Sequence, residues 1–244
     1  MFPAEVNHLR DEPLARYTTY RIGGPARILA LPKTAADLAA IGRYLLESKE
    51  PYFILGNGSN VLAPDEGFPG VVICTRELIQ ELEFLPNNQV RAAAGTLNAR
   101  ILRACAEKGL GGIEALSGVP GNVGGAIFMN AGTAAGWIDS VLVSVEVLDL
   151  RGGTRTIPKA ELAYSYREQH YLKPGEFITG AILQLIPEAA ESVKARLAES
   201  VKKRKAAQPS GWHRMCRFWW LCCQWMASVR AIGGKALKPC GFRC

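Results

Sequence analysis

The residues from Ser117 to Gly132 combine five glycines and one proline with small apolar residues and no charge. Such a backbone can approach a ligand closely, where ordinary side chains would block it. Pro120-Gly121 indicates a tight turn, and the successive N–H groups of Gly124, Gly125 and Ala126 could bind one anionic group, as phosphate-binding nests do. The alternative is a glycine-rich hairpin between two buried strands. The stretch by itself supports both interpretations.

A second glycine loop, Gly56-Asn57-Gly58-Ser59-Asn60, follows directly on the apolar run of residues 52–55. A strand over 26–31, a helix over 35–48 with Thr34 as its N-cap, and a strand over 52–55 precede the loop. This order predicts a β-α-β unit with the loop at the carboxyl end of its last strand. The loop is not a dinucleotide-binding fingerprint, because Pro64 stops any helix early, and it lacks the Lys-Ser/Thr pair of a P-loop.

Cysteine and histidine do not form a metal-binding pattern in this chain. Five of the seven cysteines lie after residue 211. There Cys222 and Cys223 are adjacent and His213 stands alone, whereas a zinc site needs spaced pairs of ligands. We therefore predict no metal site. Cys105 falls on the apolar face of a predicted helix over 99–108, which favours a buried thiol over a reactive one.

The net charge of +7 is concentrated at the carboxyl end of the chain. Residues 212–244 contain six Lys/Arg, no Asp/Glu and four of the five tryptophans, whereas residues 1–211 contain 23 Lys/Arg against 22 Asp/Glu. In the nearly neutral part, the run from Lys202 to Lys205 predicts the solvated end of a helix over 188–207. We therefore expect no nucleic-acid partner, since that function needs Lys and Arg clustered on a folded face.

Neither end of the chain resembles a membrane segment. Residues 1–13 carry Glu5, Arg10, Asp11 and Glu12 where a secretory signal would be apolar, which predicts a cytoplasmic protein. The apolar run over 218–229 is shorter than the roughly 20 residues that span a bilayer. We expect no membrane partner.

The remaining pattern predicts an α+β protein. A helix over 99–108 is expected to have Asn98 as its N-cap. The predicted strands cover residues 16–22, 70–74, 141–150 and 177–186, with a hairpin formed by residues 79–84 and 90–94.

Four ordered motifs resemble those of the UDP-N-acetylenolpyruvoylglucosamine reductase family: Arg21 to Ala26, Gly56 to Asn60, Ser117 to Gly132, and Tyr166-Arg167. The match covers about residues 17–211. The resemblance implies an FAD- and NADPH-dependent enzyme of bacterial peptidoglycan synthesis, also called UDP-N-acetylmuramate dehydrogenase. It also implies the two-subdomain FAD-binding fold of the vanillyl-alcohol-oxidase (PCMH) type, followed by a truncated substrate domain. The subdomains would cover residues 1–69 and 70–187, and residues 188–244 would be a remnant of the substrate domain.

The same resemblance assigns residues to the cofactor FAD, whose diphosphate and ring the two glycine loops would line. The implied FAD-binding residues are Gly56, Asn57, Gly58, Ser59, Asn60, Gly118, Pro120, Gly121, Gly124, Gly125, Ala126, Asn130, Ala131 and Gly132.

Arg167 matches the catalytic arginine of the family. There, a hydride passes from NADPH to the flavin and then to C3 of the enolpyruvyl group of UDP-N-acetylglucosamine enolpyruvate, while an acid protonates C2. Negative charge develops on the carboxylate side of the substrate, and a guanidinium offers it a fixed fork of donors. Without the other motifs, Arg167 would be interpreted as a surface residue beside two aromatic side chains. Tyr166 is expected either to pack or to form a wall of the substrate pocket.

The chain departs from the family pattern at two places. Glu168-Gln169 stands where an acidic residue and a serine usually follow the arginine. After Gly211, the segment that carries the proton-donating serine is absent, and the family's C-terminal glutamate has no counterpart. We interpret the aberrant tail from about Trp212 as the product of a lost reading frame, which resequencing of the coding DNA tests.

The sequence does not predict an oligomeric state. Two hypotheses about activity follow from these departures. In the first, the chain is an active reductase that takes its proton from Ser210, Cys216 or water. In the second, it is an FAD-binding remnant that cannot reduce the sugar. The second is favoured, because catalytic groups that act as a unit lose most of their effect when one is removed.

Overall fold

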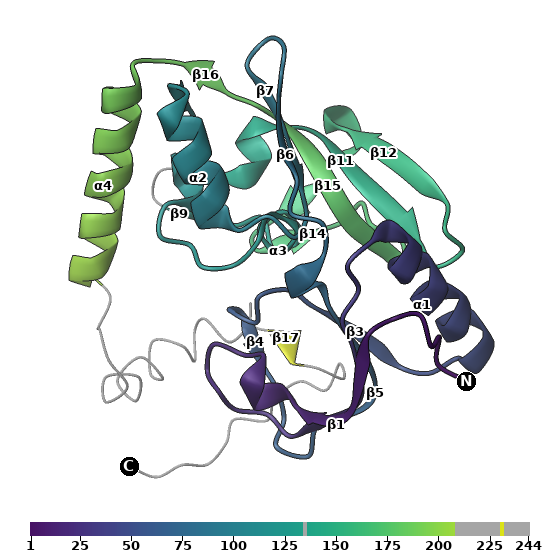
Figure 1. The fold of residues 1–244 in the computed structure, drawn as a ribbon. Helices are drawn as coiled ribbons and strands as arrows, with labels where there is room; N and C mark the ends of the chain where they lie inside the picture. Colours follow the sequence, from purple (N-terminus) through teal and green to yellow (C-terminus); the bar gives the residue numbers. More distant parts are fainter. Residues whose placement is uncertain (134–135, 208–229, 232–244) are drawn as a thin grey trace.

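The amino-terminal lobe is built on a mixed four-stranded sheet of order β1-β2-β5-β3. Its strands are β1 (His8–Pro13), β2 (Pro25–Ala30), β3 (Tyr52–Leu55) and β5 (Phe68–Cys74). β1 and β2 are antiparallel, whereas β5 runs parallel to both β2 and β3. The computed structural model describes residues 1–133, 136–207 and 230–231, and Figure 1 shows the lobes that these residues form.

Helix α1 (Ala35–Ser48) makes the crossover between β2 and β3, as the sequence predicts. A capping box fixes its start: the Thr34 hydroxyl accepts from the Asp37 N–H at 3.1 Å, and the Asp37 carboxylate accepts from the Thr34 N–H at 3.0 Å. These two bonds satisfy amides that the first turn of a helix leaves without partners. The β-α-β unit therefore delivers residues 56–60 to the carboxyl end of β3.

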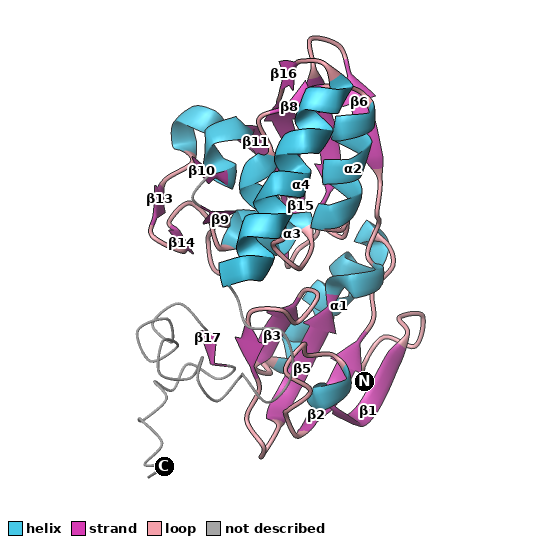
Figure 2. Cartoon of the chain, turned by 90° about the vertical axis from the view of Figure 1, so that its left-hand side faces the viewer, coloured by secondary structure: helices cyan, strands magenta, loops and turns pink. Residues whose placement is uncertain are grey.

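The second lobe contains an antiparallel sheet of order β12-β11-β15-β7-β6. Its strands are β6 (Leu82–Leu85), β7 (Gln89–Ala93), β11 (Leu142–Asp149), β12 (Thr154–Pro158) and β15 (Glu176–Gln184). Helices α2 (Asn98–Glu107), α3 (Val123–Phe128) and α4 (Ala190–Ala207) lie together on one side of this sheet, as Figure 2 shows. None of the helices in the described ranges is long and apolar enough to cross a membrane.

Short strand pairs connect these larger elements, and they include β4 (Val61–Leu62), which pairs in parallel with β17 (Arg230–Ala231). The other short strands are β8 (Leu110–Gly111), β9 (Gly132–Thr133), β10 (Gly136–Trp137), β13 (Tyr164–Ser165), β14 (Glu168–Gln169) and β16 (Ile186–Pro187).

Three buried clusters stabilise the two lobes and join them. One cluster lies inside the second lobe and includes Cys105 of α2, whose burial raises the thiol pKa to about 12. Another lies on one face of the first sheet. The third joins the lobes, because Ile41 of α1 packs in one cluster with Ile73 of β5 and Leu148 of β11. Burial of a side chain the size of Ile or Leu stabilises by about 1.5–3 kcal/mol, so α1 connects the two sheets through apolar contact.

Two predictions for the chain's local structure are wrong. Residues 16–22 do not form a strand, because residues 14–16 form a 3-10 helix and turns follow. The Thr18 hydroxyl donates to the Ile22 carbonyl at 2.9 Å, and this local bond favours a turn. Asn98 begins α2 but does not cap it; Leu97 is the N-cap residue, and the Asn98 amide donates to the Val119 carbonyl at 3.3 Å.

The expected boundary between residues 69 and 70 falls inside strand β5. This strand pairs with β2 between Phe68 and Ile73 and with β3 between Val71 and Cys74, so the sheet of the first lobe extends to Cys74. We propose that the first subdomain ends near residue 78. Of residues 188–244, expected as a remnant of the substrate domain, α4 and the pair Arg230–Ala231 are described; the tail from Trp212 to Val229 and from Ile232 to Cys244 lies outside the described residues.

An ion pair across strand β11 gives the second sheet a pH-dependent stability. The Glu176 carboxylate of β15 accepts two hydrogen bonds from Arg155 of β12, both at 2.8 Å, and its side chain is 7% exposed. The Arg155 guanidinium holds the pKa of Glu176 below its ordinary value of 4.5. The carboxylate therefore contributes stability above that pH, and the contribution is lost as the pH falls through the lowered pKa.

Glu176→Gln is expected to lower the free energy of unfolding by about 1–3 kcal/mol at pH 7, because the change leaves a guanidinium without its charged partner. The difference from the unsubstituted protein should shrink as the pH falls below about 4. Urea unfolding at both pH values measures it, with the exposed Glu47→Gln as the control. A destabilisation that stays constant with pH would contradict the role of the charge.

Candidate functional site

A pocket of about 1060 Å³ opens between the two lobes. Its volume is slightly above the roughly 300–1,000 Å³ that is typical of small-molecule sites. Both glycine loops line it, together with Arg167 and Arg204. Of the implied FAD-binding residues, the pocket brings together Gly56, Asn57, Gly58, Ser59, Asn60, Pro120, Gly121, Gly124, Gly125, Ala126, Ala131 and Gly132.

The loop of residues 56–60 keeps its shape through close backbone contact. Gly58 has a φ of +68°, and a Cβ at this position would overlap the Tyr17 carbonyl oxygen. The Gly58 carbonyl in turn accepts from the Thr19 N–H at 2.9 Å. Glycine has no Cβ, so it can adopt this φ and still lie against the backbone of residues 17–19. The close packing of the loop therefore requires a glycine at position 58.

The stretch around Gly124 is a short helix, so the hairpin alternative is wrong, and the expected nest of N–H groups is not formed either. In α3, the Gly124 N–H donates to the Ala94 carbonyl at 2.9 Å and the Gly125 N–H donates to the Asn122 side chain at 3.3 Å. The Ala126 N–H donates to the Asn122 carbonyl. All three amides are therefore engaged within the protein and do not form an anion-binding nest. Gly124 instead allows α3 to approach the residue that follows strand β7, since a Cβ on Gly124 would lie 2.7 Å from the Ala94 Cβ.

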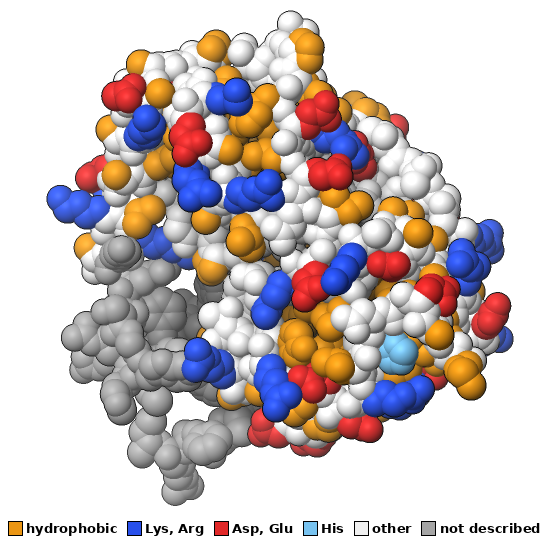
Figure 3. Space-filling view, in the orientation of Figure 1, with side chains coloured by type: hydrophobic (Ala, Val, Ile, Leu, Met, Phe, Trp, Pro, Cys, Tyr) orange, Lys and Arg blue, Asp and Glu red, His pale blue; other side chains and the backbone are white. Residues whose placement is uncertain are grey.

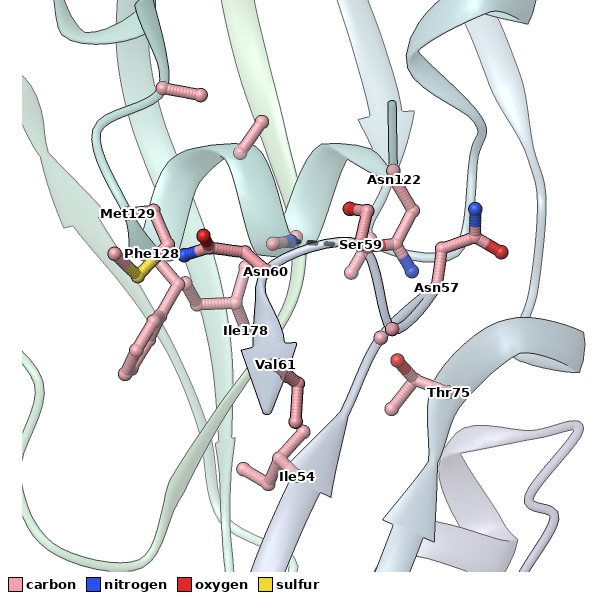
Figure 4. A pocket seen from close by; sticks show the side chains of 18 of the residues that line it. Ile54, Asn57, Ser59, Asn60, Val61, Thr75, Asn122, Phe128, Met129 and Ile178 are labelled. Carbon is pink, nitrogen blue, oxygen red and sulfur yellow. Dashed lines mark hydrogen bonds between the residues drawn. The ribbon is translucent and has the colours of Figure 1, made fainter. Parts of the chain in front are cut away.

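The two glycine loops touch each other at the pocket. The Ser59 hydroxyl donates to the Pro120 carbonyl at 3.0 Å. A Cβ on Gly56 would lie 2.8 Å from the Asn122 Oδ1, and a Cβ on Gly121 would lie 3.1 Å from the Ser59 Oγ. Figure 4 shows Asn57, Ser59 and Asn122 together on one side of the pocket. Residues about 60 positions apart in the sequence thus form one continuous wall.

The opposite side of the pocket is more apolar. Figure 4 shows Phe128 and Met129 beside Asn60, with Ile178 near them and Ile54 beside Val61. Phe128, Met129 and Ile178 were not predicted as site residues, because their apolar character in the sequence is equally typical of the core. The composition of this wall suits a flat aromatic ring system, whose faces are apolar.

Two buried polar atoms at the pocket indicate a polar ligand. The Asn98 Oδ1 and the Arg167 Nε are buried without a hydrogen-bond partner within the described part of the chain, and both residues line the pocket. Leaving a buried polar atom unsatisfied costs about 1–3 kcal/mol. A ligand with polar edges and apolar faces, such as FAD, therefore fits both the wall and these two atoms.

Arg167 lies at the tip of a small hairpin. Strands β13 and β14 pair through Ser165 and Glu168, so Tyr166 and Arg167 form the connecting turn. Arg167 has a φ of +60°, which is uncommon for a residue other than glycine and costs of order 1–3 kcal/mol. Gln169, at the position where the family has serine, accepts from the Tyr171 and Leu172 N–H groups at 3.1 and 2.8 Å. These bonds hold the base of the hairpin.

Three contacts orient the Arg167 side chain. Its Nη2 donates to the Gly132 carbonyl at 3.2 Å, and its Cζ lies 5.2 Å from the centre of the Trp137 ring and 5.8 Å from that of Tyr166. Cation–π contacts at such distances stabilise by about 0.5–1 kcal/mol at exposed sites. Trp137 was not predicted as a site residue, and no pattern near it would have identified it.

Three of the predicted site residues do not line the pocket. Tyr166 is 68% exposed and packs edge-on against Trp137. Asn130 is buried, and its side chain accepts from the Asp139 N–H at 3.3 Å, which is a structural role. Gly118 lies against Arg204 of α4.

One lobe has a mixed sheet and the other an antiparallel sheet, and their glycine loops enclose one large pocket. This arrangement defines the class of FAD-dependent oxidoreductases with a two-subdomain binding fold. Residues 26–157 match the FAD binding domain family. The solved structure of a solvent-stable cholesterol oxidase, 18% identical, shares the fold with a TM-score of 0.58 over 76% of this chain and 39% of that one. The predicted FAD-binding fold is therefore confirmed.

The chain belongs to the UDP-N-acetylenolpyruvoylglucosamine reductase family. It is 38% identical to the reductase of Moorella thermoacetica over 84% of this chain and 67% of that protein. It is 32% identical to the reductase of Caulobacter sp. strain K31 over 97% of this chain and 82% of that protein, a match that extends beyond residue 211. The crystal structure of UDP-N-acetylenolpyruvylglucosamine reductase from Thermus caldophilus is 35% identical, with a TM-score of 0.70 over 84% of this chain and 71% of that one.

Proposed function

We propose that this protein binds FAD between its two glycine loops, accepts electrons from NADPH, and takes UDP-N-acetylglucosamine enolpyruvate as its sugar substrate in the cytoplasm. The observation that carries the proposal is the position of Arg167, whose partly buried guanidinium faces the same pocket as both loops. Family membership supports the substrate class. When bound, FAD supplies hydride transfer from NADPH to C3 of the enolpyruvyl group.

The protein's own residues would position the cofactor and stabilise charge. Asn57, Ser59 and Asn98 provide polar side chains along the wall where the loops meet, and Phe128 and Met129 cover the opposite side. Because the cleft removes ligands from water, electrostatic interactions inside it are stronger than at the surface.

Arg167 would bind the carboxylate side of the enolpyruvyl group, where negative charge develops during the reaction. Its Nη2 is already held by the Gly132 carbonyl, and two aromatic rings restrict the guanidinium plane. A donor fixed in this way does not have to reorganise as the charge develops, which is the main source of electrostatic catalysis.

The proposed reaction also needs an acid that protonates C2 of the enolpyruvyl group. The sequence after Gly211 does not contain the expected serine segment, and the substitutes Ser210 and Cys216 lie outside the described residues. We therefore propose that the flavin is reduced by NADPH at an ordinary rate, whereas reduction of the sugar is impaired by a factor on the order of 10³. A catalytically inactive FAD-binding remnant is the limiting case of this proposal.

An anaerobic stopped-flow experiment on the purified full chain tests these statements separately. An absorbance spectrum after incubation with FAD and gel filtration is expected to show bound flavin, which NADPH then bleaches. Subsequent addition of the enolpyruvyl sugar should restore the absorbance very slowly. Absence of bound flavin would overturn the proposed cofactor, and rapid restoration would overturn the proposed impairment.

A further inference from the structure

Helix α4 lies against residues 114–118, at the start of the second glycine stretch. In the second turn of the helix, the Arg196 guanidinium binds the Glu114 carboxylate at 2.7 Å. One residue later, the Leu197 carbonyl accepts from the Ser117 hydroxyl at 3.2 Å, and Ser117 is buried. An ion pair and a buried hydrogen bond therefore hold the helix on this segment.

The ion pair of Arg196 differs from the other charges on the surface. On the face that Figure 3 shows, Lys and Arg side chains lie among Asp and Glu, and single exposed pairs contribute little to stability. The Glu114 side chain is only 13% exposed. One of its oxygens accepts from the Nε and Nη2 of Arg196, at 3.1 and 2.7 Å, and the other accepts from the Gly112 N–H at 2.7 Å. Arg196 also binds the Glu188 carboxylate at 2.6 Å, so these charges form a network.

The last part of α4 meets the glycine stretch itself. Lys202 and Lys203 are exposed, as predicted for the solvated end of a helix, whereas Arg204 is partly buried. A Cβ on Gly118 would lie 2.7 Å from the Arg204 Cδ, so a glycine at this position allows the helix to approach the loop. The contact between α4 and this segment therefore extends over about two turns of the helix.

Backbone hydrogen bonds connect this contact with the pocket. The Ser117 N–H donates to the Glu114 carbonyl at 2.8 Å, and the N–H of residue 119 donates to the carbonyl of residue 116 at 2.9 Å. Residues 120 and 121 follow directly and line the pocket, at the point where the two glycine loops meet. Because consecutive turns leave the backbone little freedom, the position of residues 114–118 determines where this part of the wall lies.

We propose that Glu114, Ser117 and Arg196 are positioning residues for FAD, through which α4 holds residues 119–121 in the conformation that binds the cofactor. This inference rests on the proposed function, in which FAD lies between the two glycine loops. The three residues do not line the pocket, so their effect on the ligand is indirect. A wall that is already held in place loses less conformational freedom when the ligand binds, and such preorganisation increases affinity.

The test compares Arg196→Met with Arg91→Met, which removes a similar ion pair from the same lobe. Arg91 of β7 donates two hydrogen bonds to Glu146 of β11, at 2.8 and 2.7 Å, and neither residue lines the pocket. FAD affinity is measured by fluorescence titration of the purified chain, at a temperature at which every variant is folded. We expect Arg196→Met to weaken FAD binding by about 3- to 10-fold, Arg196→Lys to weaken it less, and Arg91→Met to leave it unchanged. Equal losses in Arg196→Met and Arg91→Met would overturn the inference.

Amide hydrogen exchange of the protein without FAD gives a readout that does not depend on the cofactor. If α4 holds the segment, the N–H groups of Ser117 and Val119 should exchange at least about fivefold faster in Arg196→Met, because their local opening becomes easier. Arg91→Met should not change their exchange. Unchanged exchange of both amides in Arg196→Met would overturn the inference, as would unchanged FAD affinity in that variant. Failure of the unsubstituted protein to bind FAD would instead overturn the proposed function, and this inference with it.

Discussion

Gly58→Ala is expected to destabilise the protein by at least about 3 kcal/mol and to weaken FAD binding more than a hundredfold. The new Cβ would overlap the carbonyl oxygen of Tyr17, which belongs to the backbone and cannot move by changing a rotamer. The positive φ of +68° adds roughly 1–2 kcal/mol, because a side chain is disfavoured in that region. Urea unfolding measures the stability, and fluorescence titration measures FAD affinity.

Gly152→Ala is the matched control for this substitution. Gly152 also has a positive φ, +87°, but a Cβ there would make an ordinary contact of 3.5 Å with the Ala39 Cβ. It is not among the residues that line the pocket. This variant should therefore lose only the conformational part, about 1–2 kcal/mol, and should keep its FAD affinity. Equal effects of the two substitutions would show that close packing of the loop against Tyr17 does not matter.

Arg167→Met is expected to weaken binding of the enolpyruvyl sugar to the FAD-loaded protein by about 10- to 100-fold. The reason is the loss of hydrogen bonds from a charged donor, which contribute roughly 1.5–3 kcal/mol each. The affinity for FAD should change less than threefold, because the proposed contact of Arg167 is with the sugar. The titration uses flavin absorbance, and thermal unfolding confirms that the variant is folded.

Two further variants define the role of Arg167. Arg167→Lys keeps the charge but loses the planar fork of donors, so its sugar affinity should remain well below that of the unsubstituted protein. Arg151→Met removes an exposed arginine outside the pocket and should bind the sugar normally. Unchanged sugar affinity in Arg167→Met would contradict the proposed role.

Much of the fold could be predicted because its signals are local. The capping box of Thr34 and Asp37, and the apolar side chains of α1 at helical spacing, are encoded within a few residues. The position of the loop of residues 56–60 could be predicted for the same reason, because the loop directly follows β3. The strand expected over residues 16–22 failed because Thr18 finds a hydrogen-bond partner four residues away, which residue preference alone does not reveal.

The site was predicted less completely, because much of it comes from contacts between distant segments. One interpretation of the sequence was that the N–H groups of Gly124, Gly125 and Ala126 could bind an anion, but Ala94 and Asn122 already engage these amides. Trp137 had no recognisable pattern in the sequence, and Arg204 was interpreted as part of a solvated basic run although it lines the pocket.

The sequence by itself determined which residues can do chemistry: two loops in which glycine allows close approach, and an arginine that matches the family motif. Tertiary structure alone decided how they are used. Ser59 meets Pro120, 61 residues away, and Arg204 lines the pocket although it belongs to α4, a helix that is held to Glu114 by an ion pair of Arg196. The physical reason is that backbone preferences act over a few residues, whereas a pocket between two lobes exists only after their apolar faces have packed together.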